Sequence, residues 1–235
     1  MFEDYRFIVN PPRSNRVELA FTLVELLVVI AIVAIALIIY LPTTNKPDGT
    51  RRDACRSNLR QVALALMLYS GDNRDLCPWE VSANRGGTKE LIETGVVVEH
   101  VLKLKPYLVK PQSLLCPAEH TRFPAPDNYV EFNNSNISYF ISFDIVISNP
   151  TISIQAGDRH LALSGQPVMP GLFCATNPAA LGWSKELHFS QSAGANTGTG
   201  GNFLFKDGHS EWLPEKLLAP VFERGGLAPR RIAVP

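Results

Sequence analysis

The stretch FTLVELLVVIAIVAIALIIYL, residues 21–41, decides how the rest of the chain is organised. Apart from Thr22 and Glu25 it is an unbroken apolar run, and Pro42 follows it directly. As a helix it would be roughly 30 Å long, which is the thickness of the hydrocarbon core of a bilayer. Because it is apolar all round, it lacks the pattern of a half-buried surface helix. No A-x-A-like site ends the run, so we expect a single-pass membrane anchor rather than a removed signal peptide.

Glu25 is the one ionisable residue in this run. A carboxylate drawn to the centre of a bilayer costs about 2.5–3.5 kcal/mol, and ionisable groups inside spans usually mark function and have a partner. The run contains no Lys or Arg, so a partner must come from elsewhere. One candidate is the terminal amine of a neighbouring chain cut just before Phe21. The alternative is that Glu25 only reaches the membrane interface.

Residues 20–25, Ala-Phe-Thr-Leu-Val-Glu, together with the apolar run, resemble the processing site of type IV prepilins and type II secretion pseudopilins. The resemblance implies that a membrane aspartyl peptidase cuts between Ala20 and Phe21 and N-methylates Phe21. It also implies that Glu25 neutralises the terminal amine of an adjacent subunit during assembly. Ala20 stands where the family usually has Gly, so we expect slower cutting rather than none.

Composition divides the chain into five segments. Residues 1–20 are polar, with two adjacent prolines, and are predicted to be a leader peptide. Residues 42–49 hold two prolines and a glycine, which predicts an unwound hinge after the transmembrane segment 21–41. A globular head, 50–213, and a loose C-terminal tail, 214–235, complete the chain. The arginines flanking the span are nearly balanced, so the cytoplasmic placement of the N-terminus follows from the peptidase site and not from charge.

The segment beyond the span contains about 190 residues, a length typical of one domain. The formal net charge is zero, which argues against a dedicated nucleic-acid binder. Four cysteines occur without C-x-x-C zinc spacing. In a head outside the cytoplasm they permit two disulfides in any of three connectivities, and the sequence chooses none of them. These cysteines are Cys55, Cys77, Cys116 and Cys174.

A second helix is predicted to begin near Thr50, which together with Asp53 resembles a capping box, and to end at Gly71. Its apolar residues recur at spacings of four and three, so they form one stripe that we expect to pack against a sheet. The segment DACRSNLRQVALALMLYSGDNRDLCP resembles the corresponding part of a branch of pseudopilin-like proteins common in planctomycete- and verrucomicrobia-type genomes. The stripe consists of Cys55, Leu59, Val62, Leu66 and Tyr69.

Short strands are predicted in the second half of the head. Residues 137–148 alternate apolar and polar side chains, which favours a strand. Further strands are expected at 151–155, 160–164 and 168–175, with turns at Gly157-Asp158 and at Gly165. Asp207-Gly208 lies between the strand-like runs 202–205 and 209–213, and this pairing is a strong hairpin signal.

The hairpin segment GNFLFKDGHSEWL resembles a C-terminal motif of the same branch, in which a His precedes Asp-Gly by nine residues. Here eighteen residues separate His188 from Asp207, which fits an insertion of nine in the Gly-rich loop 194–201. His188, Asp207 and His209 are weak candidates for a metal site, since imidazole and carboxylate suit zinc. Asp207 also has a sufficient explanation as a turn residue. Calcium is possible in related heads, but no Asp/Glu-dense loop is present.

The predicted fold is α+β: a transmembrane helix, a hinge, and a second helix packed on an antiparallel sheet. The predicted function is a structural subunit of a pseudopilus or type IV pilus-like filament, with no catalytic residue and no cofactor. Its expected partners are prepilin peptidase, other pilin-like subunits and inner-membrane lipid, with the head in the periplasm of a bacterium. The alternative is a membrane-anchored enzyme or binding module with a metal site in the head. The sequence does not choose among secretion, motility and DNA uptake.

Overall fold

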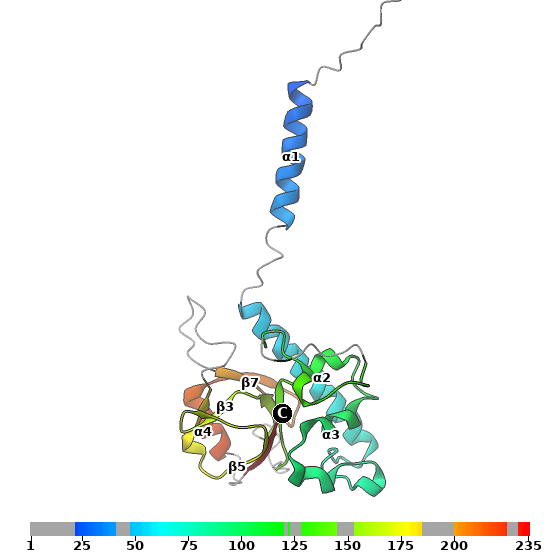
Figure 1. The fold of residues 1–235 in the computed structure, drawn as a ribbon, viewed down its shortest axis with the longest axis vertical. Coiled ribbons are helices and arrows are strands. Elements are labelled where there is room, and N and C mark those ends of the chain that lie inside the picture. The colour runs from blue at the N-terminus through cyan, green and yellow to red at the C-terminus, as the bar shows by residue number, and fades with distance from the viewer. Residues whose placement is uncertain are drawn as a thin grey trace, which may run out of the picture. The chain divides into compact units, whose positions relative to one another are not determined.

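The computed structural model describes residues 22–40, 48–119, 122, 128–144, 153–184, 200–224 and 230–235 (Figure 1). The chain divides into two compact units, Met1–Lys46 and Pro47–Pro235. Ala20, Phe21, His188 and positions 42–47 of the predicted hinge lie outside the described residues. The other two predicted hinge positions, 48 and 49, are already helical, so that part of the hinge prediction is wrong.

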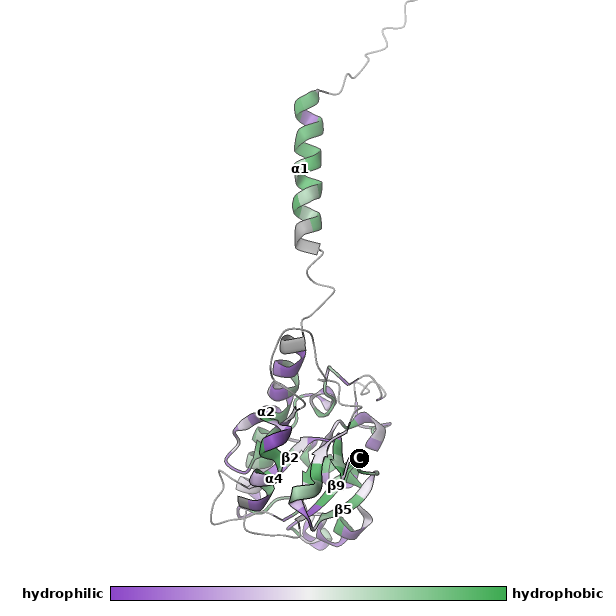
Figure 2. Cartoon of the chain, turned by 90° about the vertical axis from the view of Figure 1, so that its left-hand side faces the viewer, coloured by the Kyte–Doolittle hydropathy of each residue, from purple (hydrophilic) through white to green (hydrophobic). Residues whose placement is uncertain are grey.

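The first unit contains α1, Leu23–Tyr40. Its hydrophobic surface is interrupted by a hydrophilic band near its N-terminal end (Figure 2). The side chains of residues 23–37 are all exposed. In the described part of the chain, no helix combines the length and the apolar character needed to cross a membrane.

The second unit begins with α2, Asp48–Asp72. All five residues of the predicted stripe are buried, and α2 packs against the strands β7, Gly200–Phe205, and β8, Ser210–Pro214. The helix starts at Asp48, close to the predicted start near Thr50, and it ends at Asp72, one residue beyond the predicted stop at Gly71. It stops where Arg74 and Asp75 adopt positive φ, with the Ser70 carbonyl accepting from the amides of Asn73 and Asp75.

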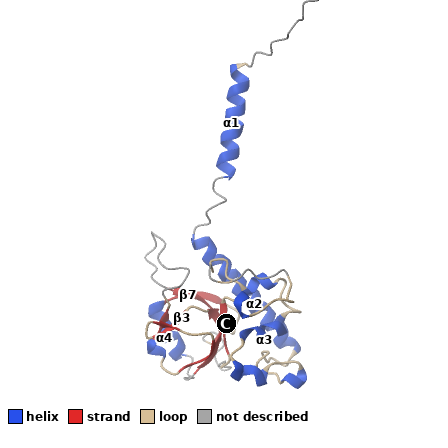
Figure 3. Ribbon diagram, in the orientation of Figure 1, coloured by secondary structure: helices blue, strands red, loops and turns tan. Residues whose placement is uncertain are grey.

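The main sheet has six antiparallel strands in the order β5-β9-β1-β2-β7-β8, which confirms the predicted α+β fold. Figure 3 shows the strands beside the helices of the head. A smaller sheet has the order β4-β3-β6. The remaining strands of the main sheet are β1, Tyr139–Ser142, β2, Ile154–Asp158, β5, Gly171–Ala175, and β9, Arg230–Val234. The smaller sheet contains β3, Leu161–Leu163, β4, Gln166–Pro167, and β6, Leu181–Trp183.

The β7–β8 hairpin is confirmed, with a difference in its turn. Phe205 and His209 form the last backbone-bonded pair, so the loop is Lys206–Gly208, and among its residues only Gly208 has positive φ, at 86°. Gly165 also forms the predicted turn, with φ of 79°. Gly157 and Asp158 belong to β2 and not to a turn, because both pair with β1 and Gly157 also pairs with Phe203 of β7.

The C-terminal segment, predicted to be a loose tail, is instead an integral part of the head. Residues Glu215–Arg224 form α4, and β9 lies between β5 and β1 in the main sheet. Ile232, Ala233 and Val234 are at most 1% exposed. The prediction was wrong because the partners of β9 lie far away in the sequence, where a local pattern gives no sign of them.

Two apolar cores lie in the head. One joins the α2 stripe to the face of the sheet that includes Tyr139 and Ile141, and the other lies under α4 and contains Phe203 and Phe222. Short helices surround the first core: η2, Ala83–Arg85, η3, Lys89–Thr94, α3, Val97–Val101, η4, Leu102–Leu104, η5, Pro111–Leu114, and η6, Asn134–Asn136. Another short helix, η8, Pro178–Ala180, lies beside α4.

One disulfide, Cys55–Cys116, ties α2 to the loop that follows η5. The loop it closes is long, with a sequence separation of 61, so it removes considerable freedom from the unfolded chain. Of the described cysteines, Cys77 is buried and Cys174 is exposed, and both are free thiols. Burial, reinforced by the nearby Glu80, raises the pKa of Cys77 to about 12, which keeps this thiol unreactive.

Candidate assembly site

The first turn of α1 brings Thr22 and Glu25 together. The Thr22 amide and hydroxyl donate to Glu25 Oε2 at 2.9 and 2.8 Å, and the Glu25 amide donates to Thr22 Oγ1 at 3.2 Å. These reciprocal bonds form a capping box, which satisfies donors that a helix start otherwise leaves unpaired. The carboxylate is thereby bound to the amide of Thr22, the residue that follows Phe21 in the sequence.

Thr22 is a site residue that the sequence reading did not use. Glu25 was expected to pair with a group from elsewhere, such as the amine of a neighbouring chain, or to reach only the membrane interface, and its contact with Thr22 was not predicted. The T-x-x-E spacing before an apolar run was the signal that could have predicted the contact. Both Thr22 bonds go to Oε2, and within the described residues Oε1 accepts no hydrogen bond. One carboxylate oxygen thus remains available to a group outside the chain.

The candidate metal residues do not assemble into a site in the described structure. Asp207 Oδ1 accepts from the His209 amide at 3.0 Å and lies 2.5 Å from His209 Nδ1, so its contacts stay within the turn. The His209 ring stacks on Phe205, with centroids 4.3 Å apart. Across the described residues, no three His, Cys, Asp or Glu side chains are grouped to hold a metal ion. His188, the third candidate, lies outside that part of the chain.

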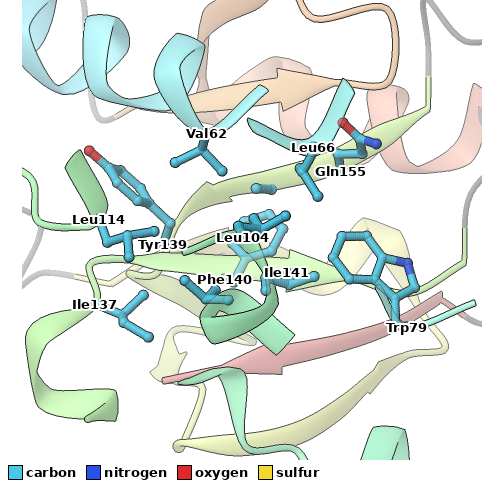
Figure 4. A pocket seen from close by; sticks show the side chains of 12 residues that line it. Val62, Leu66, Trp79, Leu104, Leu114, Ile137, Tyr139, Phe140, Ile141 and Gln155 are labelled. Carbon is cyan, nitrogen blue, oxygen red and sulfur yellow. The ribbon is translucent and has the colours of Figure 1, made fainter. Parts of the chain in front are cut away.

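A small cavity with a volume of about 10 Å³ lies between α2, β1 and β2. Its lining is almost entirely apolar, with the Gln155 amide beside Leu66 (Figure 4). A space of this size holds at most about one water molecule, and ligand pockets are far larger. This cavity is therefore a gap in the packing of the core and gives no support to a binding module.

A buried polar cluster lies at the end of β2. Glu119 Oε2 accepts from Arg159 Nε at 3.1 Å and lies 2.8 Å from His160 Nε2. Both Glu119 and His160 are buried, so this ion-paired group is part of the interior and not a surface site. Nothing in the local sequence predicted the cluster, since Glu119 comes from a loop 40 residues before Arg159.

Comparison with known families gives one match, and it falls on the segment that contains this site. Residues 15–41 match the prokaryotic N-terminal methylation motif. The matched segment includes Ala20, Phe21 and Glu25, and it supports a type IV pilin-like or pseudopilin precursor. No curated protein and no solved structure matches the chain.

Proposed function

We propose that this chain is a structural subunit of a type II secretion pseudopilus or a type IV pilus-like filament. Prepilin peptidase cuts it before Phe21 and methylates the new terminal amine. The observation that carries the proposal is the methylation motif at residues 15–41, which includes a helix start at which Glu25 is bound to the Thr22 amide.

The exposed apolar surface of α1 supports this role. Side chains such as Leu23 and Ile32 are 73% and 61% exposed, and an isolated water-soluble protein rarely shows so large an apolar surface. In our proposal, bilayer lipid covers this surface before assembly and the α1 helices of neighbouring subunits cover it afterwards. Helices pack in such surroundings mainly through van der Waals contact and polar pairing.

In this proposal Glu25 has two successive roles. In the single subunit it caps its own helix through Thr22, and in the filament its carboxylate pairs with the methylated amine of a neighbour. The amine pairing supplies a charge partner, which an ionisable group inside a membrane or a filament core needs. The head, with its disulfide, forms the filament surface on the periplasmic side. Its resemblance to the planctomycete-type branch supports placing it among those pilin-like proteins.

Two variants, one at Glu25 and one at Thr22, distinguish the helix-capping role of Glu25 from its charge-pairing role. Glu25→Gln keeps an oxygen that accepts the Thr22 bonds, because Gln serves in capping boxes, but it removes the negative charge. Thr22→Val keeps the charge and removes the hydroxyl, at a cost of about 1 kcal/mol for a lost cap. We expect Glu25→Gln to reduce filament formation at least tenfold, and Thr22→Val to assemble nearly as well as the wild type.

The measurement combines filament yield with the intact mass of the chain from its native membrane. The expected mass is that of a chain beginning at N-methylated Phe21, in the wild type and in both variants. A full-length chain in the wild type would contradict processing. Normal filaments from correctly processed Glu25→Gln would contradict the charge-pairing role and leave only the cap.

A further inference from the structure

Asp158 is a carboxyl group in the interior of the head, outside the assembly site. It is the last residue of β2 and is 0% exposed. Its Oδ2 accepts from the Asn202 amide at 2.7 Å and from Asn202 Nδ2 at 3.1 Å. Asn202, in β7, is also 0% exposed, so the two side chains meet in complete isolation from water.

Two oxygens of this pair lack a donor. Within the described residues, neither Asp158 Oδ1 nor Asn202 Oδ1 has a hydrogen-bond partner. A buried acceptor without a donor costs about 1–3 kcal/mol, and a buried ionised carboxylate costs more. An amide oxygen and an ionised carboxylate oxygen are both acceptors only. The two groups therefore lack a hydrogen that one oxygen could donate to the other.

We propose that Asp158 carries a proton on Oδ1 in the folded head and donates it to Asn202 Oδ1, so that the two side chains form a closed acid–amide pair. The acid donates to the amide oxygen and the amide Nδ2 donates to the acid oxygen Oδ2. This arrangement satisfies both orphan oxygens with one proton and buries no net charge. It joins β2 to β7, which are neighbouring strands of the main sheet.

The charged neighbours favour the protonated form. The negative charge of Glu119 opposes a second one on Asp158. The two residues that follow Asp158 in the chain, Arg159 and His160, both contact Glu119 Oε2. Tyr139, the cross-strand partner in β1, is buried, and its hydroxyl donates to the Cys55 carbonyl.

The titration follows from this geometry. Burial raises the pKa of Asp158 to about 7, with a smaller contribution from Glu119 and an opposing one from the Asn202 bonds. A carboxyl with a raised pKa stabilises the folded state fully below its unfolded pKa of about 4, and this stabilisation is lost as the pH rises to 7. The head thus gains stability through Asp158 on acidification, whereas a salt-bridged carboxylate would lose it.

Asp158→Asn tests the pair directly, because an asparagine amide can donate where the acid proton would lie. We expect the full chain in detergent to fold with this substitution. Its folding constant relative to the wild type, measured by denaturant titration of tryptophan fluorescence, should rise about tenfold for each pH unit between 4 and 7 and then level off. A ratio independent of pH, or a variant that does not fold, would overturn the proposal.

Asp144→Asn is the matched control. Asp144 accepts from the Arg231 amide at 2.6 Å and from its guanidinium at 2.9 Å, so its oxygens have donors that Asp158 Oδ1 lacks. Its substitution should weaken folding by disturbing these bonds, and it should not reproduce the rise of about tenfold per pH unit that we expect of Asp158→Asn. Infrared spectra of the wild type at pH 6 provide a second readout: a protonated carboxyl band that is absent from Asp158→Asn is expected, and its absence from the wild type would contradict the proton.

Discussion

His100 shows at the scale of one residue how the interior sets a charge state. Its ring is buried against Phe143, with centroids 4.8 Å apart, and its Nδ1 lies 2.7 Å from the Thr88 hydroxyl. Burial lowers the pKa of His100 to about 4. The imidazole is therefore neutral in the folded head, since a charged ring would need solvation that these neighbours do not supply.

This neutrality makes the head sensitive to acid. A histidine with a lowered pKa stabilises the folded state above its unfolded pKa of about 6.5, and this stabilisation is lost as the pH falls to 4. We expect His100→Gln, which can keep the Thr88 contact, to lose less stability between pH 7 and pH 4 than the wild type, by on the order of 2 kcal/mol. Equilibrium unfolding at each pH measures the difference, and parallel pH profiles would contradict it.

His100 and Asp158 act in opposite directions over an overlapping pH range. The pH profile of the wild type is a sum in which the two contributions partly cancel. Each variant must therefore be compared with the wild type at the same pH, so that the ratio isolates one group. A variant with both substitutions should show additive changes, because His100 and Asp158 bond to different partners, Thr88 and Asn202.

Single residues were predictable from sequence where the signal was local. Glu25 stood out because it is a charge in an apolar run, and Asp207 because Asp-Gly favours a turn. Asp158 was assigned to a turn with Gly157, since that dipeptide resembles a loop signal. Its burial depends on Asn202, which lies 44 residues away in the sequence, so no local pattern could reveal it.

At the scale of the element, α2 is slightly longer than the helix predicted from its sequence. Gly71 resembles a C-terminal stop, yet it lies inside the helix, and a Cβ atom placed on it would meet no heavy atom within 4 Å. The stop comes from Arg74 and Asp75 instead. Because Gly costs roughly 0.5–1 kcal/mol relative to Ala inside a helix, Gly71→Ala should stabilise the head by up to about that amount.

Gly157→Ala is the contrasting variant. A Cβ atom at this position in β2 would lie 2.7 Å from Phe140 Cε1 and 3.0 Å from the Asn202 carbonyl oxygen. Overpacking of this kind costs about 1–3 kcal/mol. Chemical denaturation of the two variants should therefore shift in opposite directions, and a destabilised Gly71→Ala would show that the glycine is needed to end the helix.

Elements whose contacts join residues close together in the sequence were predicted well. The β7–β8 hairpin joins residues separated only by its turn, and the α2 stripe repeats along one helix. The predicted strands 160–164 and 168–175 were displaced by a few residues from β3 and β5, because each run contains strand-like side chains at positions that the sheets do not use. Their bounds depend on pairing with β6 and β9, which the run itself does not specify.

At the scale of the whole molecule, the C-terminal strand is an inner strand of the main sheet. A chain that ends after Arg224 lacks β9 and leaves β5 and β1 without their shared neighbour. Losing the buried Ile232 and Val234 side chains alone removes about 3–6 kcal/mol of hydrophobic stabilisation. This is a large part of the roughly 5–15 kcal/mol that stabilises a typical domain, so we expect no cooperative unfolding transition.

Ile232→Ala provides a graded control with the strand retained. It should cost about 2–5 kcal/mol, the range for a large-to-small change in a core, and the chain should still unfold cooperatively. Calorimetry of both variants checks the prediction. A wild-type transition in the shortened chain would mean that β9 is dispensable.

The position of β9 also fixes the order in which the head can form. Residues 139–142, 154–158 and 200–214 can pair as soon as each is synthesised, because β1, β2, β7 and β8 are joined strand to strand. By contrast, β5 must wait for residues 230–234 before it has a place in the sheet. During translation, the nascent head thus has an open sheet edge at β1 until its last strand emerges. Chaperones or proteases would meet the chain during this interval.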